Sequence, residues 1–150
     1  MQPETQDALS QLADNLQELE QTALSRVENG ARLRRAALET GQRQREYYDI
    51  LHFVHMADTA RDAQNYVSQL AGRAIGEEID EAATMKALGE SLARHEYNAL
   101  DLVVGAAQTV RGVIQLVVEK HEELGPVLDA FIRERNKLGR RGCEPRQWLR

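Results

Sequence analysis

The chain has 150 residues, of which 42% are hydrophobic and 29% are charged, and its formal net charge at pH 7 is −5. This length holds one modest hydrophobic core, which excludes most multidomain enzymes. The chain contains only 3 Pro, 1 Trp, 4 Tyr and 2 Phe, whereas Ala, Leu, Glu, Gln and Arg dominate it. Such a composition favours long helices over a β-sandwich or barrel, so we expect an all-helical fold.

A long amphipathic helix is predicted at the N-terminus. Pro3 and Thr5 suit its first turn, where a missing or unpaired amide donor costs least and a hydroxyl can cap. Asn29 and Gly30 interrupt the pattern, which leaves two alternatives, a kink or short turn within the helix and a loop. The apolar positions alternate in steps of three and four, the spacing that lines one face of a helix: Leu9, Leu12, Leu16, Leu19 and Ala23.

A second helix is predicted from about residue 50 to about residue 74. Gly76, followed by acidic residues, marks a turn before the next helix. Small side chains at Ala57, Ala60 and Ala63 narrow one face, so a neighbouring helix can approach closely there. Its apolar positions are Ile50, Phe53, Val54, Ala57, Ala60, Val67, Leu70, Ala71 and Ala74.

The third stretch, residues 85–120, has the most regular pattern and follows a coiled-coil heptad register. As one helix it would form a rod on the order of 50 Å long, so its partner helices must be long as well. Gly89, Gly105 and Gly112 each cost about 1 kcal/mol relative to Ala, which means that tertiary packing must hold the rod together. The register runs through Met85, Leu88, Leu92, His95, Ala99, Leu102, Ala106, Thr109, Val113, Leu116 and Lys120.

Gly125 and Pro126 are predicted to end the third helix and begin the last one. The last helix has an apolar stripe and is expected to break up at Gly139 and Gly142. Trp148, near the C-terminus, is either a docking anchor or part of a disordered remnant. The stripe consists of Val127, Leu128, Phe131, Ile132 and Leu138.

The charge alternates in sign along the chain. Residues 1–30 carry six acids against Arg26 (net −5), and residues 31–46 carry five arginines against two acids (net +3). Residues 47–132 have a net charge of −8 and residues 133–150 a net charge of +5. A nucleic-acid-binding protein more often has a contiguous basic face with interleaved aromatics, so no nucleic-acid partner is expected. The basic tail is either a solvated terminus or a patch for an acidic partner.

Several of these residues together carry a family resemblance. In the regular stretch, apolar residues lead to a His-Glu pair and a following Leu, and a Gly-Pro turn opens the last helix. With these features the chain resembles the spectrin repeat, the three-helix left-handed coiled-coil unit of spectrin, alpha-actinin, dystrophin and the plakins. The residues are Leu88, Leu92, His95, Glu96 and Leu102, then Gly125, Pro126 and Ile132, and, more weakly, Leu51, His52, Phe53, Ala57 and Asp58.

The resemblance covers residues 46–138 and has gaps. The family's tryptophan in the first helix has no counterpart among residues 63–66 unless Tyr66 replaces it. The third-helix tryptophan is missing, and the last helix looks truncated. If the resemblance holds, it implies a spacer and docking unit of the cortical actin cytoskeleton. Residues 1–45 would then be an N-terminal amphipathic helix or the closing helix of a preceding repeat, suggested by Leu16, Leu19, Ala23 and Arg26, and residues 139–150 a basic tail, ordered or disordered.

The residue pattern offers little catalytic or metal-binding chemistry. Tyr47, Asp49, His52 and His55 could share one helix face, but di-metal helix bundles need matching ligands on several helices, and no second set exists. The adjacent pairs His95-Glu96 and His121-Glu122 point in different directions around a helix. There is no phosphate-binding loop, nucleophile elbow or paired-cysteine motif, so we predict no catalytic, cofactor or metal residues.

Two single residues keep alternatives open. His95 lies in the apolar seam and is predicted to be a buried imidazole bonded to a neighbouring side chain, with a pH switch as the alternative. Cys143, the only cysteine, cannot form an internal disulfide, which suits a reducing cytoplasm. Its arginine-rich surroundings could lower its pKa, but a surface thiol is favoured over a nucleophile.

The sequence therefore predicts an all-α protein, an elongated antiparallel three-helix bundle over residues 46–138 with an additional N-terminal helix. Its predicted function is non-enzymatic scaffolding by a spectrin-repeat-like unit that binds other helical repeats or cytoskeletal proteins. The alternative is a small helical adaptor or export chaperone that binds a partner's amphipathic helix. The apolar face Leu9–Ala23 suggests a homodimer. No membrane helix or signal peptide is expected, so the predicted location is the cytoplasm, with the cytoskeleton or cell cortex as a refinement.

Overall fold

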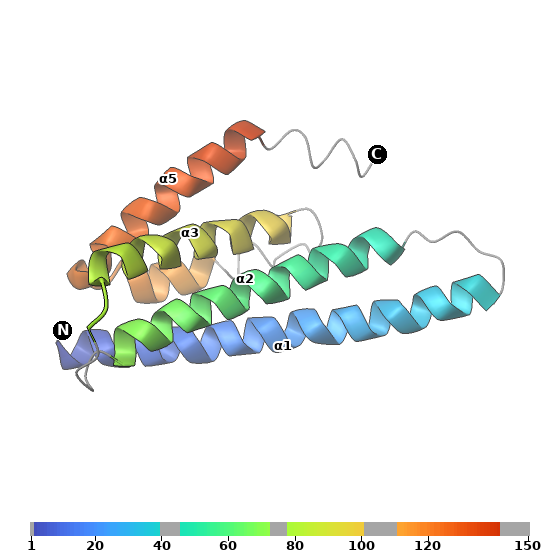
Figure 1. Cartoon of the computed structure of the whole chain (residues 1–150), viewed down its shortest axis with the longest axis horizontal. Helices are drawn as coiled ribbons and strands as arrows, with labels where there is room; N and C mark the ends of the chain where they lie inside the picture. The colour runs from blue at the N-terminus through green and yellow to red at the C-terminus, as the bar shows by residue number, and fades with distance from the viewer. Residues whose placement is uncertain (1, 40–45, 73–77, 101–110, 142–150) are drawn as a thin grey trace.

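The computed structural model describes residues 2–39, 46–72, 78–100 and 111–141, without the side chains of residues 33, 34, 37, 38, 46–52, 99, 100, 140 and 141. Every secondary-structure element in these ranges is helical, which confirms the predicted all-α class (Figure 1). The elements are α1 (Pro3–Glu39), α2 (Glu46–Gly72), α3 (Glu81–Leu100), the π-helix η2 (Ile114–Val118), the short η3 (Glu122–Leu124) and α5 (Gly125–Arg141). None of these helices is long and apolar enough to cross a membrane.

Helices α1 and α2 form a long antiparallel hairpin (Figure 1). Pro3 occupies the start of α1, as predicted, and the helix passes through Asn29 and Gly30 without a break. The buried alanines Ala57, Ala60 and Ala63 give α2 the predicted narrow face. Near the middle of the hairpin, Gln64 Nε2 donates to the carbonyl oxygen of Leu16 at 3.5 Å. The burial of these three alanines agrees with the predicted small-residue face, and the close approach of a neighbouring helix stays a prediction.

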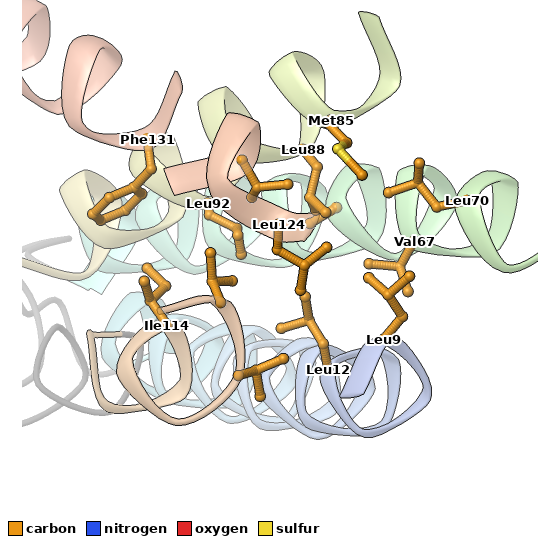
Figure 2. Packing of buried hydrophobic residues seen from close by; sticks show 14 of the residues in the cluster. Leu9, Leu12, Val67, Leu70, Met85, Leu88, Leu92, Ile114, Leu124 and Phe131 are labelled. Atoms are coloured by element: carbon orange, nitrogen blue, oxygen red, sulfur yellow. The ribbon is translucent and has the colours of Figure 1, made fainter. Parts of the chain in front are cut away.

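The main core gathers side chains from every element near the N-terminal half of α1. Figure 2 shows Leu9 and Leu12 of α1 converging with Val67 and Leu70 of α2 and with side chains of the later helices. Leu9, Leu12 and Leu16 of α1 are fully buried within this one chain, Ala23 is 1% exposed, and Leu19 is partly buried against the same core. The face Leu9–Ala23 is therefore already used in the monomer, so it is not free to complete another chain's bundle, as the homodimer hypothesis had assumed. The core also includes Met85, Leu88, Leu92, Ile114, Val117, Val118, Leu124, Val127 and Phe131.

The predicted continuous helix over residues 85–120 is wrong. A straight helix would separate Glu96 from Arg111 by about 22 Å along its axis, yet Arg111 Nη2 lies 3.6 Å from Glu96 Oε1. The chain must reverse between α3 and residue 111, so the segment 111–118 lies back against the bundle. The heptad register changes with it, because Ile114, Val117 and Val118 are buried while Leu116 is 62% exposed. The register positions Leu102, Ala106 and Thr109 lie outside the described residues.

Helix α5 runs parallel to α3, which also differs from the expected antiparallel three-helix bundle. Gly89 faces Val127 and Ala130 near the start of α5, and seven residues later Glu96 pairs with Arg135, five residues beyond Ala130. Both contacts advance in the same direction along the two helices. The spectrin-like arrangement would instead require α5 to run back along α3. Between residues 46 and 138 the described part of the chain therefore contains α2, α3, the segment 111–118 and α5.

The helix ends show local chemistry that the sequence pattern only partly predicted. Asp80 caps α3, because its Oδ1 accepts from the amide of Ala83 at 3.1 Å. The chain leaves η2 at His121, which is extended, whereas Gly125 is already helical. The boundary that the sequence placed at Gly125 therefore lies four residues earlier, at His121. At the other end of α5, the helix passes through Gly139 and continues to Arg141, beyond the expected break.

The hairpin continues beyond the main core as a distal arm, defined here as residues 24–39 of α1 and 46–55 of α2. A small cluster at its base contains buried Ala23, Met56 and Ala57 with half-buried Phe53. After Ala23, none of the described side chains of α1 is buried. Figure 1 shows the arm extending past the end of α3, with none of the other described helices alongside it.

Candidate functional site

The main polar feature of the interior is His95, whose imidazole lies between α3 and α2 at the level of Met56 and Thr59. His95 is fully buried. Its Nδ1 lies 3.0 Å from the carbonyl oxygen of Met56 and 3.0 Å from Thr59 Oγ1. This confirms the predicted buried imidazole bonded to a neighbouring side chain.

The surroundings of His95 determine its protonation. A carbonyl oxygen can only accept, so Nδ1 carries the proton and donates it to Met56. The Thr59 hydroxyl in turn donates to the backbone oxygen of His55 or Met56, at 2.9 and 3.1 Å. Burial lowers the pKa of His95 to about 4, although the hydrogen bond to Met56 acts in the opposite direction. The imidazole is therefore neutral at pH 7, and its buried Nε2 has no hydrogen-bond partner among the described residues.

The side chain of the neighbouring residue Glu96 points in a different direction around α3. Its side chain is 4% exposed, and Oε1 lies 3.3 Å from Arg135 Nε and 3.6 Å from Arg111 Nη2. Both arginine side chains are about half exposed, so one buried carboxylate oxygen connects α3 to two segments at the surface. The other oxygen, Oε2, is buried and has no partner in the part of the chain that the structure describes. Adjacent residues point about 100° apart around a helix, which explains how His95 and Glu96 contact different neighbours.

These two side chains act as polar connections between helices. His95 joins α3 to α2, and Glu96 joins α3 to α5 and to the segment 111–118. Removal of the His95 side chain would take a donor away from the buried contact with the Met56 carbonyl oxygen, whereas Arg111 and Arg135, the partners of Glu96, are about half exposed and remain accessible to water. Two guanidinium groups next to Glu96 disfavour a bound cation, and within the described residues no three His, Cys, Asp or Glu side chains gather as metal ligands.

The metal candidate of the sequence analysis is only partly described. The side chains of Tyr47, Asp49 and His52 lie outside the described residues, and His55 is exposed on α2. Cys143 and Trp148 also lie outside the described residues. His121 is half-buried beside exposed Glu122 at the turn before α5.

A second feature lies at the surface of the same helices. Leu116 of η2 is 62% exposed and Ile132 of α5 is 46% exposed. The segment 111–118 and α5 are antiparallel neighbours, because Arg111 and Arg135 meet at Glu96 and a short connection joins their other ends. Leu116 and Ile132 therefore lie on the same side of Glu96 along the bundle. Arg133 and Lys137 are also exposed. We refer to these four exposed residues, Leu116 of η2 and Ile132, Arg133 and Lys137 of α5, as the docking face.

No protein-family model matches the chain, and comparisons with curated proteins and with solved structures find no match either. The resemblance to spectrin repeats therefore remains a prediction. The candidate sites are defined by their geometry alone.

The sequence identified His95 as a seam residue, but it did not identify the groups that meet it. Met56 and Thr59 lie 39 and 36 residues away in the chain. The helical spacing of Met56 and Thr59 on α2 predicts that they lie near the core, but it does not predict that they contact His95. Arg111 and Arg135 gave no signal at all, because the predicted rod placed both of them far from Glu96. The docking face was missed for the same reason, since Leu116 was assigned to the buried seam.

Proposed function

We propose that this chain is a non-enzymatic protein-docking module, a small helical adaptor that holds an acidic amphipathic helix of a partner against the docking face. The observation that carries the proposal is the exposure of Leu116 and Ile132 on two neighbouring segments. Exposed large apolar side chains on adjacent elements supply the contact area that an amphipathic helix uses. Neither of these two side chains is part of the main core cluster.

The positive charge of α5 determines which net charge a partner helix should carry. From Ile132 to the end of the helix, five arginines and lysines stand against Glu134 alone. Charged residues around an apolar contact contribute more to association rate and partner choice than to affinity. A basic rim therefore favours acidic helices and disfavours basic ones. This matches the suggestion from the sequence that the C-terminal segment serves as a patch for an acidic partner.

The spacer of the actin cytoskeleton, implied by the resemblance to spectrin repeats, is the second candidate. One observation favours it: Leu88, Leu92 and His95 are buried along one face of α3, as that pattern requires. A spacer also needs a straight rod in register with antiparallel partners, whereas α3 is followed by a reversal and lies parallel to α5. An adaptor needs no rod, so we favour it. Neighbouring coding sequence with further units of similar length would support the spacer instead.

The docking face can be tested with a synthetic peptide of three heptads, Leu at positions a and d and Glu at the exposed positions. Fluorescence anisotropy of the labelled peptide should show binding that weakens as salt is added. Replacement of Leu116→Glu together with Ile132→Glu should weaken binding at least about tenfold, because both apolar contacts are lost and negative charge faces the acidic peptide. The matched control is Leu24→Glu, which changes an exposed leucine on the distal arm and should bind like the wild type.

A second peptide tests whether binding depends on the sign of the partner's charge. The same heptads with Lys in place of Glu should bind far more weakly to the wild-type chain. Equal binding of both peptides would show non-specific apolar association and would contradict the proposed selectivity. No binding of the Glu peptide at micromolar protein would reject the docking face itself.

A further inference from the structure

The distal arm carries an apolar surface that the rest of the described chain does not cover. Leu24 is 37% exposed, and Val27, Phe53 and Val54 are half-buried. In the same helix α1, Leu9, Leu12 and Leu16 are completely buried. The pattern of apolar residues therefore continues past the point at which the main core ends.

The arm is long relative to the contacts that support it. The part of α1 beyond Ala23 has 16 residues to Glu39, which corresponds to about 24 Å of helix. Helices of this length are marginal in water without tertiary packing. Within the described residues, the helix packed along this part of α1 is α2 alone (Figure 1). A two-helix arm with an exposed Leu24 and half-buried Val27 and Val54 can serve as half of a four-helix bundle.

The charges of the arm's two helices are opposite in sign. Residues 24–39 carry four arginines against two glutamates, and residues 46–55 carry Glu46 and Asp49 and no arginine or lysine. The described charged side chains of the arm are all exposed: Arg26, Glu28, Arg32, Arg35 and Glu39. Closer to the main core the acidic residue lies on α1 and the basic residue on α2, since Glu20 of α1 pairs with Arg61 of α2 at 3.3 Å. A surface of this kind is self-complementary under a two-fold rotation, because each basic helix can meet the acidic helix of a second copy.

We propose that the distal arm is a homodimerisation element, whose open face is covered by the distal arm of a second copy to form a four-helix bundle. The α1 helix of each chain lies against α2 of the other, and the open apolar side with Leu24 forms the new seam. This places the interface away from Leu9–Ala23 and away from the docking face. An acidic or a basic foreign helix would complement only one of the arm's two helices, whereas a second copy complements both. The dimer does not depend on the proposed adaptor function.

Sedimentation equilibrium of the full chain over a wide concentration range tests this proposal. The wild type is expected to pass from monomer to dimer as concentration rises. Leu24→Glu should weaken the dimer at least about tenfold, because it places a carboxylate in the seam while remaining accessible to water in the monomer. Arg32→Glu should weaken it as well, and added salt should act in the same direction.

The matched controls are Leu116→Glu and Ile132→Glu, which change the other exposed large apolar residues and should leave the dimer unchanged. Circular dichroism of each variant shows whether the monomer keeps its helical content. A wild-type chain that is monomeric at all concentrations would overturn the proposal. So would a dimer that persists in Leu24→Glu and is lost in Leu116→Glu, because the docking face would then be the interface.

Discussion

The two ends of the α1–α2 hairpin have similar helical sequences but very different environments. Near the N-terminus, Leu9, Leu12 and Leu16 are fully buried against α2, α3 and the later helices. Beyond Ala23, α2 is the one described helix that lies along α1, and none of the described side chains of α1 is buried there. Helical periodicity thus specifies which side of a helix is apolar, whereas the number of neighbouring elements decides whether that side becomes core. The contrast between the main core and the distal arm leads to four predictions.

The largest effect is expected from a charge in the main core. Leu92→Asp should lower the free energy of unfolding by more than about 4 kcal/mol, because it loses a buried side chain that is 1% exposed and buries an unpaired carboxylate. Urea unfolding followed by circular dichroism measures the change. Leu24→Asp on the distal arm is the matched control and should cost less than about 1 kcal/mol at concentrations where the chain is monomeric. Equal effects would mean that the arm belongs to the same cooperative core.

The second prediction concerns the pH dependence of the main core. His95 has a pKa of about 4 in the folded chain and of about 6.5 when unfolded. Between these values the unfolded state binds more protons, so stability is lost as pH falls from 6.5 toward 4. The expected loss is about 3 kcal/mol, at roughly 1.4 kcal/mol for each pH unit. His95→Gln should reduce this slope in urea unfolding, whereas His55→Gln, at an exposed position, should leave it unchanged. An unchanged slope in His95→Gln would assign the pH dependence to other groups.

The third prediction tests the close approach of α3 and α5. A Cβ at Gly89 would lie 2.8 Å from both Ala130 Cβ and the backbone nitrogen of Phe131, so one helix must shift. Gly89→Ala should therefore destabilise the chain by about 2 kcal/mol, despite the better helix propensity of Ala. Gly139→Ala is the matched control in α5, where the Cβ meets nothing within 4 Å. That variant should be stabilised by up to about 1 kcal/mol. A stabilised Gly89→Ala would rule out the close crossing.

The smallest effect is expected in the distal arm. Val27→Ala removes part of a half-buried side chain and should cost less than about 1 kcal/mol at concentrations where the chain is monomeric. Val67→Ala makes the same change at a position that is 1% exposed, and about 2 kcal/mol is expected there. Thermal unfolding at fixed concentration compares the two variants. A larger loss at Val27 than at Val67 would reverse the order of stability assigned to the two regions.

Local features of the fold were predictable to a useful extent. The apolar spacing of α1 and α2, the narrow alanine face of α2 and the burial of Leu88, Leu92 and His95 all follow from periodicity that neighbouring residues express. The reversal of the chain between α3 and residue 111 could not be predicted from periodicity. The uninterrupted heptad spacing from Met85 to Lys120 is equally compatible with one long helix and with two pieces that pack side by side, because each piece keeps the same local pattern.

The candidate sites were less accessible than the helices. His95 could be recognised as a buried histidine, but its partners on α2 could not, since many α2 positions have the same helical phase. Glu96 meets Arg111 and Arg135 only because the chain reverses and α5 lies parallel to α3. The exposure of Leu116 and Ile132 likewise depends on how these segments pack. A residue's type and spacing carry no information about a partner that a distant turn brings alongside.

By itself, the amino-acid sequence determined that this chain is helical, which faces of its first two helices are apolar and that His95 belongs to the interior. These properties depend on propensities and periodicity within a few turns of helix. Only the tertiary structure decided the reversal after α3, the parallel α3–α5 pair, the partners of Glu96 and the division into main core and distal arm. Those features depend on which surfaces exclude water together, and that choice is made by competition among all of the chain's helices at once.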